Sequence, residues 1–486
     1  SSVGIETTRF NNQIKKKITN FSKDLEIELN EVKLVLDPIN FQFNTKTLGP
    51  KIKFRKQILE IESIQTQVSL NSIFKDSFPL KNLNISTKTI EVRKLISFIR
   101  SINRNPKLLI LENFIKKGHL IADLKIEFDE SGNVKNNYEI NGFVKDGKIE
   151  FLEKYKFEKI NFNFKIEEKA SNFQEITFLY KGLNLVFEKI TTQKIDNEIY
   201  VNGKLNNENL IVKEKFLEEL LNTSNLKIKK MNIDSNNIFS FKLDKKFKIR
   251  DLKIKSKVKL NEAIVSNNLS LKSFFPEIKN QINFLDHDLE IDYQKNEFKI
   301  KGVGNLLVQK NKDKIEYVFL KKNKKINFDT SLIIDNNELL VDFLNYKKKN
   351  ESKLKIQIKG SKKDNGILKI DLLQLRNQKD KIELKDIFFD KNFKILKLKK
   401  IKFNYIDKED QINKFDIVND KKNYILKGDA LNANYLLDKL TGSDNQNKLS
   451  LFKKEINLKI KINNIRLDEE YSLKNLEGNL VIFNDN

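Results

Sequence analysis

Apolar and polar residues alternate through most of this chain. Residues 159–166 read Lys-Ile-Asn-Phe-Asn-Phe-Lys-Ile, and residues 252–260 read Leu-Lys-Ile-Lys-Ser-Lys-Val-Lys-Leu. A period of two matches a β-strand, in which successive side chains point to opposite faces of the sheet. One face of each strand then carries Ile, Leu, Phe and Val, whereas the other carries mostly Lys, Asn and Glu. The chain must therefore cover, or use, a very large apolar surface.

The alternation continues with few interruptions and predicts a mainly β protein. Turn-forming residues separate the apolar runs, which favours strands joined by hairpins in an antiparallel meander. We expect an elongated, strongly curved antiparallel sheet that forms a groove with an apolar interior, together with a few short helices. The expected turns include Lys145–Gly147, Asp196–Asn197, Asn206–Asn207, Asp335–Asn337 and Asp364–Gly366.

Helical spacing replaces the alternation in a few places. Residues 93–117 predict two helices that are separated at Asn105-Pro106, because proline disfavours continuation of a helix. Gly118 is expected to end the second helix in a left-handed conformation. Further short helices are expected within residues 6–21, 213–222, 272–284 and 433–440.

The 486 residues contain no Pro/Ser-rich linker after residue 119, so we expect one continuous architecture there. Three regions are predicted. Residues 1–22 hold an amphipathic helix that follows a membrane anchor absent from this sequence. Residues 23–118 form a β segment closed by the helical pair at 93–117, and residues 119–486 form a continuous repeating β-groove, truncated at its C-terminal end.

The net charge of +25 raises the question of a polyanionic partner such as nucleic acid or an anionic membrane. Nearly all of the cations are lysines that lie on the polar faces of successive strands, whereas readers of phosphates and bases favour arginine forks beside aromatic rings. Lysine on outer faces and edges also prevents sheets from aggregating. We therefore expect no nucleic-acid partner.

The residues needed for most catalytic and metal sites are scarce. The chain has no cysteine and two histidines, His119 and His287. His287 lies between Asp286 and Asp288. On a strand both neighbours point to the face opposite to that of His287, so no metal site is expected there. No phosphate-binding glycine loop or histidine-based triad is present. The sequence predicts no catalytic residue, no metal and no cofactor.

The apolar strand face is what remains as a binding surface. In a sandwich, two such faces would cover each other; in an open trough, the face would stay exposed unless an apolar ligand filled it. Acyl chains fit this requirement, because burial contributes ~0.8 kcal/mol per CH₂ group. The candidate groove-lining residues are in-phase apolar positions, whose alternative role is ordinary sheet core: Phe162, Phe164, Ile166, Leu252, Ile254, Val258, Leu458 and Ile460.

Four short segments share a glycine that has apolar residues two and four positions before it. The pattern predicts a structural repeat, although glycines could also recur by chance at bulges or close approaches of strands. The segments are Tyr138–Val144, Ile199–Leu205, Phe298–Gly304 and Tyr424–Ala430.

These glycine-centred units resemble the AsmA-like superfamily, especially its YhdP-type members. Residues 424–440 are similar to that group's recurrent unit, a strand ending in Gly-Asp that leads to a small-residue turn and a Leu-Leu helix. Residues 8–11 and the expected helix after them resemble the layout that follows an inner-membrane anchor. Residues 473–480 resemble the late repeats of the family.

The resemblance implies a non-enzymatic, periplasmic lipid-transfer module anchored in the inner membrane of a Gram-negative bacterium. Phospholipid acyl chains would move along the β-groove between the inner and outer membranes, and outer-membrane proteins are further expected partners. The alternative is an envelope structural or assembly protein, similar to the TamB group, that helps outer-membrane proteins to insert. The resemblance leads us to expect that the anchor and the end that would meet the outer membrane both lie outside this sequence.

Overall fold

The alternating segments all fold as β-strands in the computed structural model. The structure describes residues 5–7, 11–12, 15, 25–30, 32–69, 80–103, 105–129, 134–135, 137–151, 155–221, 227–246, 248–266, 271–349, 352–391, 394–420, 423–435, 437 and 456–482. Within these residues, 28 strands belong to one hydrogen-bonded sheet, and β21 and β22 form a separate two-stranded sheet. The mainly β prediction is confirmed.

Packing divides the chain into two compact units. Unit 1 contains Ser1–Asn207 and Asn236–Leu252, and unit 2 contains Glu208–Ser235 and Lys253–Asn486. Three strands contribute residues to both units: β14 (Glu198–Lys213), β15 (Ile228–Leu243) and β16 (Ile249–Ser266).

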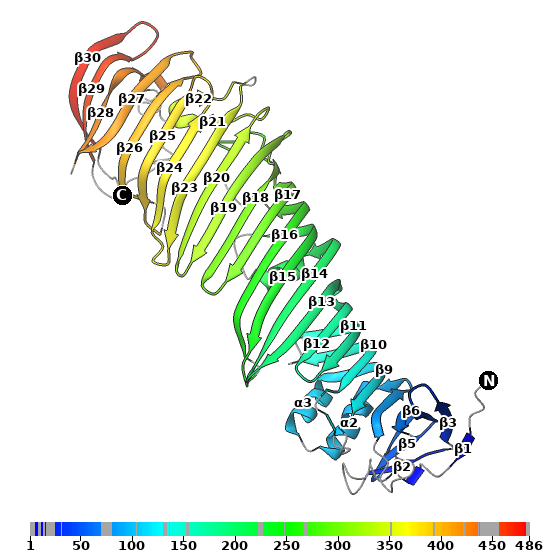
Figure 1. Ribbon diagram of the computed structural model, residues 1–486. Coiled ribbons are helices and arrows are strands. Elements are labelled where there is room, and N and C mark those ends of the chain that lie inside the picture. The colour runs from blue at the N-terminus through cyan, green and yellow to red at the C-terminus, as the bar shows by residue number, and fades with distance from the viewer. Residues whose placement is uncertain are drawn as a thin grey trace. The chain divides into compact units, whose positions relative to one another are not determined.

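The remaining elements of unit 1 are thirteen strands and two helices within the described residues (Figure 1). They are β1 (Ile5–Thr7), β2 (Leu25–Glu28), β3 (Val32–Asp37), β4 (Gln42–Leu48), β5 (Lys51–Phe54), β6 (Gln57–Ser69), β7 (Leu80–Thr87), β8 (Ile90–Glu91), α2 (Val92–Ile102), α3 (Pro106–Phe114), β9 (Ile115–Glu127), β10 (Glu139–Phe151), β11 (Tyr155–Glu167), β12 (Ala170–Tyr180) and β13 (Leu183–Ile195).

Unit 2 is built mainly from successive antiparallel hairpins. Its elements are α4 (Glu214–Leu221), β17 (Gln281–Gln294), β18 (Glu297–Leu307), β19 (Lys312–Lys322), β20 (Lys325–Ile334), β21 (Leu340–Val341), the 3-10 helix η2 (Asp342–Leu344), β22 (Tyr346–Lys347), β23 (Leu354–Lys363), β24 (Leu368–Arg376), β25 (Lys381–Phe389), β26 (Ile395–Ile406), β27 (Ile412–Asp420), β28 (Asn423–Asn432), β29 (Ile456–Arg466) and β30 (Ser472–Ile482). The pairing of β28 with β29 is parallel, whereas β29 and β30 pair antiparallel.

The helix predictions are confirmed in part. The pair α2 and α3 and the helix α4 lie where they were expected. Residues 272–280 form turns and bends and β17 begins at Gln281, so the helix expected at 272–284 is wrong. Within 6–21, residues 6 and 7 belong to β1 and residues 11, 12 and 15 are helical; the rest lies outside the described residues. Within 433–440, residues 434, 435 and 437 are helical.

Gly118 does not end a helix. The α3 helix ends at Phe114, and Ile115 already pairs with Ile149 of β10. The ladder hydrogen bonds of β9 therefore replace the helical ones before Gly118 is reached. Inside β9, Gly118 has a φ of 145° and passes close to Gly147, whose Cα would lie 3.2 Å from a Cβ at position 118.

Two of the expected hairpin turns lie inside long strands, and the one at Lys145–Gly147 is a β-bulge. Asp146, with a φ of 52°, lies within β10, and Asn209, with a φ of 51°, follows Asn206–Asn207 within β14. Side chains of the next strand accept hydrogen bonds from these backbone N–H groups. Asn161 Oδ1 accepts from Asp146 N (3.1 Å), and Asp234 Oδ1 accepts from Asn209 N (2.6 Å).

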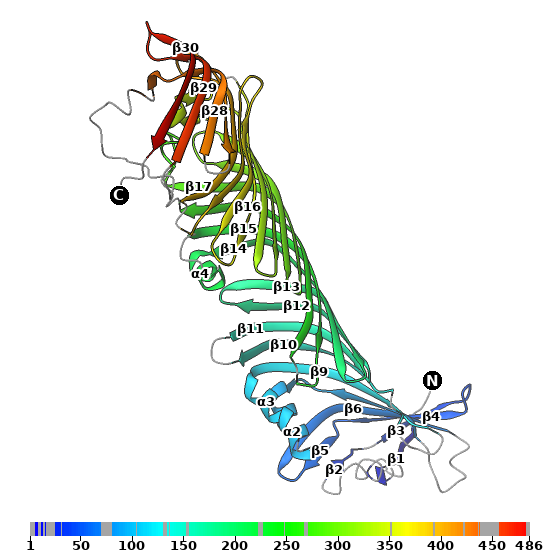
Figure 2. The same cartoon turned by 90° about the vertical axis from the view of Figure 1, so that its left-hand side faces the viewer.

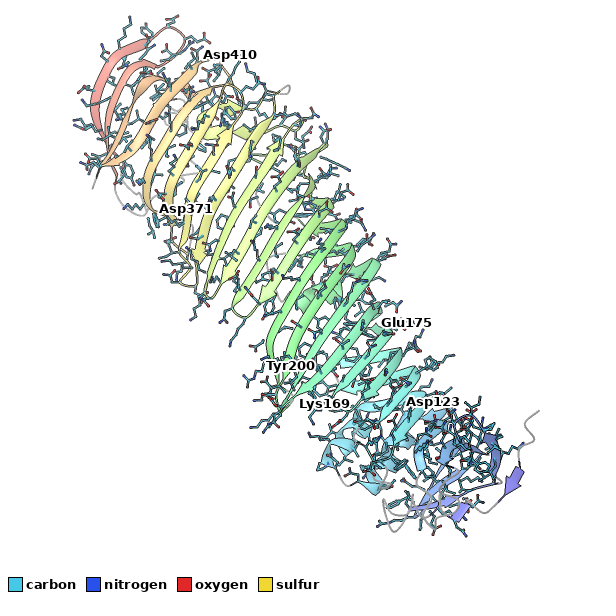
Figure 3. The ribbon with its side chains drawn as sticks, viewed as in Figure 1. Asp123, Lys169, Glu175, Tyr200, Asp371 and Asp410 are labelled. Atoms are coloured by element: carbon cyan, nitrogen blue, oxygen red, sulfur yellow. The ribbon has the colours of Figure 1, made fainter. Side chains whose placement is uncertain are left out.

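Left-handed residues recur inside neighbouring strands. They include Asp146, Lys159, Glu175, Asn209, Asp251, Asp286 and Asp386, of which Figure 3 labels Glu175. A bulge bends its strand and increases the local twist. A sheet that carries bulges on so many strands can curl around its apolar face.

Each unit has its own core. In unit 1, Phe98 of α2 packs into a cluster of strand residues that includes Ile61, Ile64, Val68 and Leu83. In unit 2, the buried cluster gathers Ile334, Leu354, Ile382, Phe403, Phe415, Leu426 and Ile462, together with Leu339, Val341 and Tyr346 from the connection between β20 and β23.

Candidate functional site

The apolar face of unit 2 encloses a cavity of about 760 Å³. Of the side chains that line it, only those of Thr330 and Tyr424 carry an oxygen atom. The apolar lining residues are Leu271, Phe274, Phe275, Ile315, Leu332, Leu339, Val341, Phe343, Leu344, Ile356, Ile358, Leu373, Leu375, Ile382, Leu384, Ile387, Ile395, Leu398, Ile401, Phe403, Phe415, Ile417, Leu426, Leu431 and Leu458. Its volume lies within the range of small-molecule binding sites, ~300–1,000 Å³.

Strand register produces this lining. Directly opposed residues point to the same face of the sheet, so one apolar residue on each strand builds a row across the strands. The first row contains Ile358, Leu373, Leu384, Ile401, Ile417 and Leu426. The second row contains Ile356, Leu375, Ile382, Phe403 and Phe415. The first row runs from β23 to β28 and the second from β23 to β27, and Figure 1 shows these strands in that order.

The sheet of unit 2 curls strongly around the cavity. Ile315 of β19 and Leu458 of β29 both line it, although eight strand-to-strand steps separate them: β19 to β20, β23, β24, β25, β26, β27, β28 and β29. In a flat sheet these steps would span ~38 Å, at about 4.8 Å per strand. The predicted strong curvature is therefore confirmed within unit 2.

Residues 335–349, which connect β20 to β23, cover part of the cavity; we call them the cover segment. Leu339, Val341, Phe343 and Leu344 contribute their side chains to the lining. A second stretch joins them, because Leu340 N donates to Phe274 O (2.9 Å). The apolar face is thus enclosed by its own curvature and by chain segments that include the small two-stranded sheet of β21 and β22.

Hydrogen bonds attach the cover segment to the end of β26, to the turn before β25 and to the turn between β26 and β27. Tyr405 Oη donates to Leu344 O (3.0 Å), and Tyr346 Oη donates to Asp380 Oδ2 (3.3 Å). Asn345, whose φ is 50°, donates from Nδ2 to Glu409 Oε1 (3.0 Å). Burial raises the pKa of both tyrosines above the usual range, so their hydroxyls remain protonated donors.

Charged groups hold the cover segment from outside the cavity. Lys348 is fully buried, and its Nζ donates to Asp335 O (2.5 Å). Burial lowers the pKa of Lys348. Lys349 forms an ion pair with Asp410 in the turn between β26 and β27 (2.8 Å), and Figure 3 labels Asp410. The polar contacts therefore lie at the ends of the strands, and the lining of the cavity remains apolar.

Unit 1 presents a second apolar surface, which we call the aromatic face. Phe162, Phe164 and Ile166 point to the same side of β11 and are all half-buried. The Phe162 ring lies 6.0 Å from that of Phe164 and 5.9 Å from that of Phe173 on β12. Further ring contacts link Phe157 to Phe178, Phe178 to Phe187 and Phe187 to Phe239.

Five of the eight predicted groove residues belong to these two surfaces or to the first row, and three do not. Leu458 lines the cavity, and Ile460 lies opposite Leu426 at the end of the first row. Phe162, Phe164 and Ile166 belong to the aromatic face. Leu252, Ile254 and Val258 share one side of β16 and are half-buried, but they do not line the cavity.

The sequence reasoning missed most of the cavity. Residues such as Leu373, Leu384 and Phe415 have the same alternation as the candidates that were chosen. Periodicity assigns each of them to the apolar face of its strand, but it does not distinguish an enclosed part of that face from an open one. The Asp335–Asn337 sequence predicts a turn, and in the structure these residues begin the cover segment.

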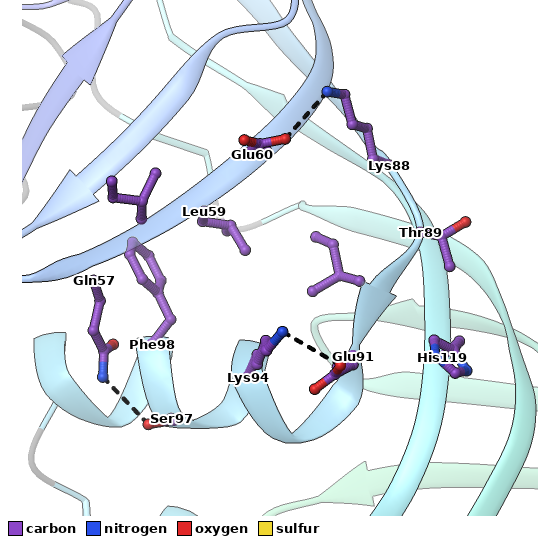
Figure 4. A pocket seen from close by; sticks show the side chains of 12 residues that line it. Gln57, Leu59, Glu60, Lys88, Thr89, Glu91, Lys94, Ser97, Phe98 and His119 are labelled. Carbon is purple, nitrogen blue, oxygen red and sulfur yellow. Dashed lines mark hydrogen bonds and ion pairs between the residues drawn. The ribbon is translucent and has the colours of Figure 1, made fainter.

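A smaller, mixed pocket of about 500 Å³ lies in unit 1 among β6, β8, β9 and α2 (Figure 4). Leu59 and Phe98 supply apolar lining. Its charged groups form pairs with each other: Lys88 with Glu60 and Lys94 with Glu91, both at 3.3 Å. His119 also lines it. With these charges mutually neutralised, the pocket lacks the uniform chemistry of the cavity in unit 2.

His287 has a packing role. The side chain is fully buried, its Nε2 lies 3.0 Å from Asn305 O, and its Nδ1 lies 3.4 Å from Tyr317 Oη. A Cβ on Gly304 would lie 2.3 Å from the ring, so the imidazole packs on that glycine. Burial lowers the pKa of His287. Within the described residues, no group of three or more His, Asp or Glu side chains could hold a metal ion.

The models of known protein families gave no match to this chain, and the curated proteins gave none either. The resemblance to the AsmA-like superfamily rests on the sequence units quoted above. Among the helices within the described ranges, none combines the length and the apolar character needed to cross a membrane.

Proposed function

We propose that this protein is a non-enzymatic lipid-binding module that carries the acyl chains of phospholipids on its apolar sheet face. The observation behind the proposal is the cavity of about 760 Å³ in unit 2, whose lining contains only two side-chain oxygens. Such a cavity offers methylene groups apolar contact and little polar recognition. Each buried CH₂ would contribute ~0.8 kcal/mol, so two acyl chains could be held without a specific headgroup site.

The aromatic face of unit 1 supports the same function. Phe162, Phe164 and their ring neighbours are only half-buried, and a continuous apolar surface of this kind gains free energy when an apolar ligand covers it. By resemblance to AsmA-like proteins, the setting would be the periplasm of a Gram-negative bacterium. There the module would pass phospholipid between the inner and outer membranes.

Native mass spectrometry of the purified chain tests lipid binding directly. We expect phospholipid to copurify and the empty protein to take up cis-parinaric acid, a fluorescent fatty acid. A chain with no copurified lipid and no uptake of the probe would refute the proposal. Crosslinks in cells to outer-membrane proteins, with none to lipid, would favour the TamB-like assembly role instead.

Two neighbouring leucines of β24 provide a matched pair of variants. Leu373 lines the cavity, whereas Leu372 lies opposite Lys359 and Lys385, away from the cavity lining. Leu373→Trp should remove room for about two methylene groups and weaken binding of the probe about ten-fold. Leu372→Trp should leave the affinity within about two-fold of wild type, which is under 0.5 kcal/mol. Equal losses in both variants would indicate damage to the fold.

A further inference from the structure

The hairpin between β3 and β4 in unit 1 ends in an apolar tip, which we define as residues 36–43. Ile39 is 88% exposed, Phe41 is 68% exposed and Leu36 is 50% exposed. Single exposed apolar side chains are common on soluble proteins. Here three exposed apolar side chains lie on one hairpin, and two of them, Ile39 and Phe41, lie in its turn. Together they form a local apolar patch.

The backbone of the turn is arranged to display Phe41. Four residues, Pro38 to Phe41, connect the strands, and Phe41 has a φ of 48°. Glycine or asparagine ordinarily occupies a left-handed position in a hairpin loop, and a bulky residue seldom does. Such strain persists only where the surrounding structure enforces it, and it is concentrated at functional positions.

Asp37 holds the turn in this conformation. Its Oδ1 accepts from Asn40 N (3.2 Å), and its Oδ2 accepts from Asn40 Nδ2 (2.9 Å) and from Gln42 Nε2 (3.2 Å). These hydrogen bonds lower the pKa of Asp37, with the contribution of Asn40 largest. The polar groups of the turn are thus satisfied within the hairpin, and Ile39 and Phe41 face solvent.

One face of the hairpin passes from core to solvent along its length. Val32 is fully buried, and Thr47 opposite it is 1% exposed. Four residues further along the same face, Leu36 is half exposed and lies opposite Phe43. The hairpin therefore extends beyond the core of unit 1, and Figure 2 shows it projecting at β4.

Cationic residues follow the tip along the strands. Lys33 and Lys46 are directly opposed and both exposed, and Glu6 of β1 lies opposite Lys33 on its other side. Strand geometry places them ~10 Å from the Leu36–Phe43 pair, at about 3.4 Å per residue. The whole chain carries a net charge of +25. An apolar apex with lysines behind it matches a membrane interface, where side chains enter ~5–10 Å and anionic headgroups attract the cations.

We propose that the apolar tip inserts into the surface of an anionic lipid bilayer and docks the protein there. A protein partner is less suited to this shape, because a stable interface usually covers ~800 Å² on each side, and a projecting four-residue turn offers far less. A bilayer needs no complementary groove. This proposal does not rest on the cavity of unit 2. A variant can therefore lose bilayer docking and keep lipid binding in the cavity, or the reverse.

The absence of tryptophan from the sequence allows a site-specific probe. Ile39→Trp places the only tryptophan at the tip, and Ile249→Trp places one at a control position of unit 1 that is 58% exposed. With vesicles of phosphatidylcholine and phosphatidylglycerol, Trp fluorescence at position 39 should shift to the blue and be quenched by brominated acyl chains. The control should show neither effect. Equal behaviour at both positions would overturn the proposal.

Vesicle sedimentation of variants supplies the second measurement. Ile39→Ser combined with Phe41→Ser should weaken binding to these vesicles at least about ten-fold, whereas Ile249→Ser should not. Phe41→Gly separates folding from docking, because glycine accepts the left-handed backbone: thermal stability should rise while vesicle binding falls. Unchanged vesicle binding in both tip variants would refute the proposal. A change in oligomeric state without a change in vesicle binding would assign the tip to contacts between copies of the chain.

Discussion

Gly142 lies directly opposite Phe164, and the aromatic ring occupies the space that a side chain at position 142 would need. A Cβ on Gly142 would lie 2.5 Å from Phe164 Cζ. Two other glycines of the predicted repeat have the same relationship, because Phe239 packs on Gly203 and Tyr317 packs on Gly302. Gly428 differs: a Cβ there would lie 2.4 Å from the backbone oxygen of Lys414 and from the Cα of Phe415. Packing of an aromatic ring on a strand glycine shields the backbone that the missing side chain leaves open. Three of the four sequence units therefore share a structural role, and at the fourth the glycine permits close approach of the neighbouring backbone.

Gly142→Ala should destabilise unit 1 by about 1–3 kcal/mol, because the added methyl group overpacks a filled site. Chemical unfolding of the variant measures the loss. Replacing Phe164 by Leu in the same chain should recover only part of it, since the methyl group meets both the ring and the backbone oxygen of Ile121, which would lie 2.6 Å away.

Gly478 on β30 provides the control. No atom lies within 4 Å of a Cβ built at this position. Gly478→Ala should therefore be neutral or slightly stabilising. If Gly142→Ala and Gly478→Ala behave alike, the aromatic ring on Gly142 has no energetic importance.

His287 should make stability fall as the pH drops below about 7. Burial lowers its pKa in the folded state, so below about 6.5 the unfolded chain binds a proton that the folded protein does not. The stabilising contribution is present above pH 6.5 and is lost as the pH falls, with a slope of at most ~1.4 kcal/mol per pH unit. Unfolding curves at several pH values should show a shallower slope for His287→Gln. An identical slope would exclude His287 as the cause.

Glu383 should contribute to acid sensitivity at lower pH. Although burial alone would raise its pKa, hydrogen bonds from Lys381, Lys385 and Gln374 lower the pKa to about 2. Its contribution is therefore complete above pH 4.5 and disappears as the pH falls toward 2. Glu383→Gln should lower the free energy of unfolding at pH 7 by about 1–3 kcal/mol and have little effect near pH 2.

Glu477 is the matched exposed carboxylate in unit 2. It forms an ion pair with Lys461 at 2.9 Å, and its side chain is 66% exposed. Solvent screens such pairs, so Glu477→Gln should change stability much less than Glu383→Gln does. Similar losses in the two variants would contradict the importance assigned to the burial of Glu383.

The cover segment should open more often when its tyrosine hydroxyls are removed. Tyr346→Phe and Tyr405→Phe each delete one hydrogen bond to the edge of the sheet, which typically contributes ~0.5–1.5 kcal/mol. Hydrogen exchange of the amides in residues 339–347 should accelerate about two- to ten-fold in each variant. Tyr471→Phe, at a tyrosine that is 64% exposed, should leave this exchange unchanged. Unaltered exchange in all three variants would show that the two tyrosine hydroxyls do not hold the segment.

The turn chemistry illustrates where sequence reasoning reached its limit. Asp196–Asn197 and Asp364–Gly366 are hairpin turns, as predicted, but Lys145–Gly147 lies in a bulge of β10. Both structures need a residue with positive φ, and Asp, Asn and Gly supply it in either case. The difference depends on whether the neighbouring strands continue past that residue. In β10 they do, because β9 and β11 pair with it on both sides of the bulge.

The sequence by itself determined the strand faces of this protein. Alternation assigned Phe164, Leu458 and Ile460 to apolar faces, since the side-chain period of a strand is a local property of the backbone. Only the tertiary structure decided which parts of those faces are enclosed. The cavity exists because bulged strands curl and because contacts such as Tyr405 with Leu344, which are 61 residues apart, hold the cover segment in place. Such contacts depend on the positions of distant segments, and no local pattern encodes them.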